Sequence, residues 1–191
     1  MLRARRHAGF SIIELMIAIT IAGVLIALGL PSLGGYIQTA RLGSFAKSFY
    51  TGAQLARTEA IRLNLPVDFV LTNTPIAAGI ETAAVASTTG RNWLVRYTDP
   101  LGVVQLVEAK AILDNGGASP AMTTLATNGT VTFNSLGASS LGLTSIDIAN
   151  PAAGLCDPAG SVRCWRVAVS PGGQIRMCNP SSASATDTRA C

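Results

Sequence analysis

Hydrophobic residues fill the first part of the chain almost without interruption. From Phe10 to Leu30 the only charged residue is Glu14. A helix over these 21 residues is about 30 Å long, which matches the hydrocarbon core of a lipid bilayer. We therefore predict a transmembrane helix over residues 10–30.

Beyond this run the pattern becomes that of a two-faced helix, over residues 31–64. Apolar side chains recur there at intervals of three, four or seven: Phe45, Phe49, Leu55, Ala56 and Ala60. Such a stripe packs against a sheet. Asn64 and Pro66 are expected to end the helix, because proline disfavours a helical residue before it and has no N–H for the next hydrogen bond.

The rest of the chain has the pattern of short strands, rich in β-branched residues and separated by Gly, Pro, Asn or Asp. We predict strands over 67–72, 93–98, 103–108, 130–134, 144–148, 164–169 and 174–178, and loops over 75–90 and 113–127. The region 65–191 is long enough for one small domain with its own core. The expected fold class is α+β, a long N-terminal helix packed on an antiparallel β-sheet domain.

Charges on either side of the apolar run give its orientation. Arg3, Arg5 and Arg6 precede it, whereas the first charge after it is Arg41. Since positive residues stay in the cytoplasm, the amino end is expected there and the β-rich domain across the membrane.

Glu14 is unusual in a membrane span, because a carboxylate near the helix centre costs about 2.5–3.5 kcal/mol on insertion scales. Cleavage after Gly9 would give Phe10 a free α-amine about one turn away. In a stack of subunits the amine of one chain can then meet the Glu14 of its neighbour in an apolar core, where opposite charges attract strongly. We favour this over an acid that snorkels to water.

The residues around the start of the apolar run resemble the class III leader and helix of type IV pilins and type II secretion pseudopilins: Gly9, Phe10, Ser11, Ile12, Ile13, Glu14, Leu15 and Met16. The resemblance implies a leader over 1–9. It also implies cleavage between Gly9 and Phe10 by a prepilin peptidase, N-methylation of Phe10, and assembly with other pilins through Glu14 and the N-terminal helix. The implied location is the bacterial inner membrane, followed by a pilus or pseudopilus.

Two further stretches, 55–67 and 131–137, resemble the GspH/FimT branch of pilin-like proteins. This resemblance implies a minor pilin, a structural subunit and assembly initiator of a type IV pilus. Two alternatives remain: an H-type pseudopilin of a type II secretion system, or a FimT-like pilin that binds DNA for uptake.

The inventory of side chains argues against an enzyme. His7 is the only histidine and lies in the predicted leader, so the mature chain has no imidazole for acid–base chemistry or for a metal. We predict no catalytic residue, cofactor or metal. The net charge of +4 falls to +1 when Arg3, Arg5 and Arg6 are removed, so the overall charge does not indicate a nucleic-acid partner.

Four cysteines lie in the last 36 residues: Cys156, Cys164, Cys178 and Cys191. In an oxidising compartment they are expected to form two disulfides, in one of three pairings. A hairpin of 164–169 with 174–178, closed by a loop of two or four residues, places Cys178 opposite Trp165 and Cys164 on the other face. We therefore prefer the pairs 156–164 and 178–191. A zinc site is the rival.

Candidate DNA-binding residues lie in the same region: Arg163, Arg166, Arg176 and Arg189. DNA-binding FimT-type proteins carry a Gly-Arg-x-Arg motif, which here reads Gly173-Gln174-Ile175-Arg176 and retains only the second arginine. The predicted hairpin places Arg166 and Arg176 on opposite faces, although a one-residue bulge would reverse this. Weak, salt-dependent binding to DNA of any sequence is one hypothesis. Arginines that only solvate the sheet are the other.

Overall fold

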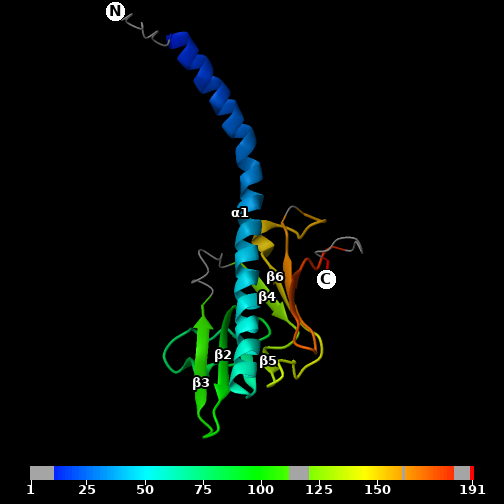
Figure 1. Ribbon diagram of the computed structural model, residues 1–191. Helices are drawn as coiled ribbons and strands as arrows, with labels where there is room; N and C mark the ends of the chain where they lie inside the picture. The colour runs from blue at the N-terminus through cyan, green and yellow to red at the C-terminus, as the bar shows by residue number, and fades with distance from the viewer. Residues whose placement is uncertain (1–10, 112–120, 161, 183–189) are drawn as a thin grey trace, which may run out of the picture.

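The computed structural model describes residues 11–111, 121–160, 162–182 and 190–191, except for the side chains of residues 27–33. A single helix, α1 (Ile12–Leu63), runs from the start of this description into the β-rich domain. Its first half extends beyond the domain and its second half lies along it (Figure 1). The helix ends where predicted, because Asn64 adopts a left-handed conformation with φ of 55°.

The second half of α1 buries one face against the domain. The residues on this face are fully buried: Leu42, Phe45, Ala46, Phe49, Ala53, Ala56 and Ala60. They belong to a core that also takes side chains from the strands. The predicted stripe is therefore the packing face, with Leu55 only partly buried at its margin.

Within the described ranges, the strands form two antiparallel sheets of four strands each. The first sheet has the order β3 (Val104–Lys110), β2 (Asn92–Thr98), β1 (Val67–Thr72) and β5 (Thr130–Phe133). The second has the order β4 (Thr123–Ala126), β6 (Thr144–Ala149), β7 (Trp165–Val169) and β8 (Ile175–Cys178). Helix α1 contacts strands of both sheets and therefore links them.

The α+β fold class is confirmed, with two sheets in place of the single sheet expected. Strand β4 lies inside the predicted loop 113–127, and a short helix, α2 (Ile80–Ala83), lies inside the predicted loop 75–90. A 3-10 turn, η2 (Pro151–Ala153), follows β6. Strand β4 buries only Thr124 and Ala126, and small or polar inward residues give no apolar alternation to detect.

The register of the terminal hairpin differs from the prediction by one residue. Cys178 lies opposite Arg166 rather than Trp165, and Ala168 lies opposite Arg176. The turn holds five residues, 170–174, because Gly173 adopts a positive φ of 76° and the Ser170 N–H donates to the Gln174 carbonyl at 2.9 Å. A shift of one residue reverses every face assignment in the second strand.

Two sequence-based inferences are corrected by this register. Directly paired residues point to the same side of a sheet, so Arg166 and Arg176 share a face instead of lying on opposite faces. The same alternation places Cys164 on the side of Cys178, so the geometric argument against pairing these two cysteines was wrong.

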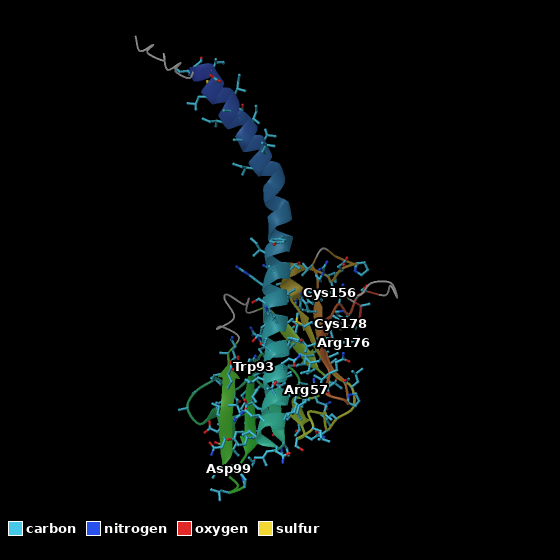
Figure 2. All side chains as sticks on the ribbon, in the orientation of Figure 1. Arg57, Trp93, Asp99, Cys156, Arg176 and Cys178 are labelled. Atoms are coloured by element: carbon cyan, nitrogen blue, oxygen red, sulfur yellow. A yellow bond between two sulfur atoms is a disulfide. The ribbon has the colours of Figure 1, made fainter. Side chains whose placement is uncertain are left out.

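Polar contacts reinforce the apolar interface between α1 and the sheets. The Trp93 indole N–H donates to the Ser48 hydroxyl at 2.9 Å in a buried bond between β2 and α1. The Arg57 Nε donates to the Gly137 carbonyl at 3.1 Å, after β5. Trp93 is labelled beside the green strands, and Arg57 on the lower half of the helix (Figure 2).

Candidate functional site

Glu14 occupies the first turn of α1, three residues after the N-cap Ser11. The Ser-x-x-Glu spacing is that of a capping box, yet the Ser11 side chain makes no capping hydrogen bond. Glu14 is exposed and pairs with none of the described residues. The predicted cleavage pair, Gly9 and Phe10, lies outside the described residues.

The exposed half of α1 carries large apolar side chains all round. Those with more than half of their surface exposed are Ile12, Ile13, Leu15, Met16, Ile17, Ile19, Ile21, Val24, Leu25 and Ile26. Across the described part of the chain, no helix combines the length and the hydropathy of a membrane span. The predicted span, 10–30, includes Phe10 and the side chains of 27–30, which lie outside the description.

Two disulfides link the cysteines in the preferred pairs, Cys156–Cys164 and Cys178–Cys191. A turn brings the first pair together, since the Asp157 N–H donates to the Val162 carbonyl at 2.8 Å. A parallel bridge between Asn179 and Ala190 aligns the second pair. Local contacts on both sides of the hairpin therefore select the pairing.

The candidate DNA-binding arginines differ in their surroundings. Arg166 is paired with Asp147 of β6, with Nε–Oδ1 and Nη2–Oδ2 distances of 2.5 and 2.8 Å, and this hydrogen bonding raises the pKa of the guanidinium. Arg176 is exposed on β8, where its Nη2 lies 3.5 Å from the Cys191 carbonyl oxygen. Arg163 is half-buried before β7. Arg189 lies outside the described residues.

Among the described residues, no group of three or more His, Cys, Asp or Glu side chains could hold a metal ion. A polar pocket beside Arg91, formed by three separate segments of the chain, was not predicted from the sequence. The distant segments share no motif, and only the folding of β4 next to the start of β2 brings them together.

One half of the long helix packs on antiparallel sheets. The other half is exposed and apolar, with a single acid. This arrangement defines the chain as a pilin-like protein. A prokaryotic N-terminal methylation motif matches residues 4–30. The family model of the type II transport protein GspH matches residues 46–173, well over half of the sequence. The chain belongs to the GspH family, a family of structural, non-enzymatic proteins.

Solved structures that are similar to this chain come from two bacteria. The type IV minor pilin FimU of Pseudomonas aeruginosa is 15% identical, with a TM-score of 0.54, over 78% of this chain and 97% of FimU. The minor pseudopilin EpsH of the Vibrio cholerae type 2 secretion system is 16% identical, with a TM-score of 0.44, over 72% of this chain and 95% of EpsH. No curated protein matches the sequence.

Proposed function

We propose that the chain is a minor pilin that helps to start the assembly of a type IV pilus. One observation carries the proposal: the exposed half of α1 is apolar on all sides and contains one acid, Glu14, without a partner among the described residues. An apolar surface of this extent is unfavourable in water. In our proposal the bilayer covers residues 10–30 before assembly, and the helices of neighbouring subunits cover them in the filament.

The methylation motif over residues 4–30 supports cleavage after Gly9 and methylation of Phe10 as the processing step in this proposal. The new amine of one subunit then pairs with Glu14 of its neighbour. Because apolar side chains surround this pair, the attraction is stronger than in water, and an unpaired Glu14 is costly. The pair therefore fixes the axial register of each incoming subunit.

The experiment compares Glu14→Ala with Glu59→Ala in cells that make the filament. Glu59 is a matched control, since it lies on the same helix but pairs with Arg62 of its own chain. We expect both variants to be cleaved, and only Glu14→Ala to lose incorporation into sheared filaments. Equal incorporation of the two variants would contradict the role of Glu14.

Mass spectrometry of the purified chain tests the processing step. The wild type should begin at a methylated Phe10, and Gly9→Leu should retain residues 1–9. A mature amino terminus at any other residue would refute the proposed cleavage site.

A pseudopilin of a type II secretion system is the alternative, and the match to the type II transport protein GspH supports it. Deletion of the gene separates the two machines. If the chain is a type IV pilin, its deletion removes surface pili and leaves secretion of exoproteins unchanged. If it is a pseudopilin, its deletion stops secretion of exoproteins and leaves surface pili unchanged.

Weak DNA binding is a second candidate function, supported by the exposed Arg176 on β8 of the terminal hairpin. Since Asp147 neutralises Arg166, Arg176 is the residue expected to contact phosphate. Arg176→Ala should lower both affinity and salt dependence, by about one unit of slope for each lost phosphate contact. Gln174→Arg should strengthen binding, and Arg62→Ala is the control. Absence of binding by the wild type at low salt would exclude this function.

A further inference from the structure

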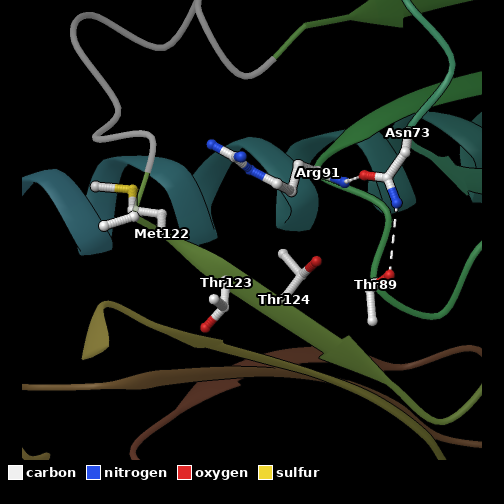
Figure 3. A pocket seen from close by; sticks show the side chains of 7 residues that line it. Asn73, Thr89, Arg91, Met122, Thr123 and Thr124 are labelled. Carbon is white, nitrogen blue, oxygen red and sulfur yellow. Dashed lines mark hydrogen bonds between the residues drawn. The ribbon is translucent and has the colours of Figure 1, made fainter. Parts of the chain in front are cut away.

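A pocket of about 400 Å³ lies where the end of β1 and the start of β2 meet the start of β4. Asn73, Thr89, Arg91, Ala121, Met122, Thr123 and Thr124 line it. Arg91 is the only charged residue among them. Its side chain extends across the pocket toward Met122, above Thr123 and Thr124 (Figure 3).

The Arg91 guanidinium differs from those of Arg57 and Arg166 in the hydrogen bonding of its Nε. Its Nε is buried and makes no hydrogen bond with the described residues. By contrast, Arg166 donates from Nε and Nη2 to the two oxygens of Asp147, and Arg57 donates from Nε to the Gly137 carbonyl. A buried donor without an acceptor is unfavourable, so an acceptor at the Arg91 Nε would stabilise the site.

The other polar side chains of the pocket already have acceptors for their protons. The Asn73 amide lies 3.4 Å from the Thr89 hydroxyl, and the Thr124 hydroxyl donates to the Gly90 carbonyl at 2.9 Å. The Thr123 hydroxyl lies 3.4 Å from the Ala149 carbonyl. The Thr89 hydroxyl lies 3.2 Å from the Ser87 hydroxyl, and either can be the donor. Arg91 is therefore the one charged donor that the lining residues offer to a ligand.

The backbone holds Arg91 in place before any ligand binds. The Arg91 N–H donates to the Asn73 side-chain oxygen at 3.3 Å. Gly90 packs so closely on the Thr72 backbone that a β-carbon would overlap the Thr72 nitrogen. The backbone of Arg91 is therefore set by the fold, so that binding has only the side chain to order.

We propose that this pocket binds a carboxylate group, with the guanidinium of Arg91 as its principal contact. A guanidinium matches the two oxygens of a carboxylate in a bidentate pair, as Arg166 and Asp147 show in this chain. A phosphate dianion would leave its second charge without compensation, since no other cation lines the pocket. The carboxylate comes either from an acidic side chain of another protein or from a small free acid. The inference does not depend on the proposed role in a filament.

The test follows the Nε–H resonance of Arg91 by nitrogen-15 NMR in the full chain, dissolved in detergent micelles. Arg91→Lys identifies the resonance by its loss. Sodium acetate and a glutamate blocked at both backbone ends are titrated separately, with sodium chloride and acetamide as controls for ionic strength and for shape. Saturable shifts with the two carboxylates, and not with the controls, are expected. No saturable shift, or equal shifts with chloride or acetamide, would overturn the proposal.

Two variants make the result specific to Arg91. With the Thr89 and Thr124 backbone amides as reporters, Arg91→Gln should weaken carboxylate binding at least about tenfold, the loss expected for a charge-assisted hydrogen bond. Arg176→Gln should leave it unchanged. If Arg91→Gln binds as well as the wild type, the pocket does not use Arg91 and the proposal fails. Tighter binding of blocked glutamate than acetate indicates a protein partner, whereas similar affinities indicate a free acid.

Discussion

Ser48 and Trp93 connect α1 to β2 through one buried hydrogen bond. Among the described residues, the Ser48 hydroxyl is the acceptor of the Trp93 indole N–H, at 2.9 Å. Both side chains are buried. The loss of this acceptor would leave a polar donor in an apolar interface between helix and sheet.

We expect Ser48→Ala to lower the free energy of unfolding by about 1–3 kcal/mol, the cost of an unsatisfied buried donor. Thr58→Ala is the control, because Thr58 is an exposed hydroxyl on the same helix, bonded only to the Gln54 carbonyl. Urea unfolding followed by Trp fluorescence measures both. Equal stabilities of the two variants would show that the Trp93 N–H finds another acceptor.

Asp99 gives the turn between β2 and β3 a dependence on pH. Hydrogen bonds from the Val103 N–H and then from the Gln105 side chain hold the pKa of this carboxyl below its usual 3.8. Since the folded pKa is lowered, the stabilisation is present above the usual pKa and is lost as pH falls through the lowered one.

The Val103 amide should therefore exchange with solvent faster as the pH falls below about 4, relative to its intrinsic rate. Asp99→Asn should remove this change while keeping a side-chain acceptor. The Val95 amide, in the middle of β2, is the internal reference. A Val103 amide that follows the Val95 amide at every pH would contradict the role of Asp99.

At the scale of the elements, two glycines of α1 test how closely the helix packs. A β-carbon at Gly43 would lie 3.4 Å from Trp165 Nε1, an ordinary contact. At Gly52 it would lie 2.8 Å from Phe69 Cε2 and 2.9 Å from Trp93 Cε3. Gly43 therefore tolerates a methyl group, and Gly52 does not.

We expect Gly43→Ala to raise stability by up to about 1 kcal/mol, the difference in helix propensity. Gly52→Ala should lower it, because overpacking costs about 1–3 kcal/mol and exceeds that gain. Thermal unfolding of the two variants, which carry the same chemical change on the same helix, gives the comparison. A stabilised Gly52→Ala would show that the interface is looser than the distances indicate.

Elements with a strong apolar period were predictable from the sequence, and those defined by their partners were not. Strand β1 was predicted at its observed bounds because its buried residues include Phe69, Val70 and Leu71. Strand β4 presents Thr124 to the interior and exists because it pairs with β6. The hairpin register was missed because it depends on the conformation of Gly173, which composition alone does not determine.

The candidate sites divide in the same way. Glu14 stands out in sequence because it is a charge within an apolar run. Arg91 has no such signal, because the residues around it come from three segments and its missing partner is a property of the fold.

At the scale of the whole molecule, α1 forms part of the core of both sheets. Its fully buried side chains begin at Leu42, so a variant that lacks residues 1–38 should be soluble and should unfold cooperatively. A variant that lacks residues 1–64 would expose Phe69, Val95 and Val167 to water, and is expected to bind the dye ANS without a cooperative transition. Calorimetry separates the two outcomes. Cooperative unfolding of the shorter variant would refute the role of the helix in the core.

The position of α1 across two sheets also has a mechanical consequence. A pull along the helix axis reaches the first sheet through Trp93 and the second through the contacts of α1 with β7 and β8. The two sheets are therefore loaded side by side rather than one after the other. Each carries only part of the tension, and separation of the helix requires shear along the whole interface at once.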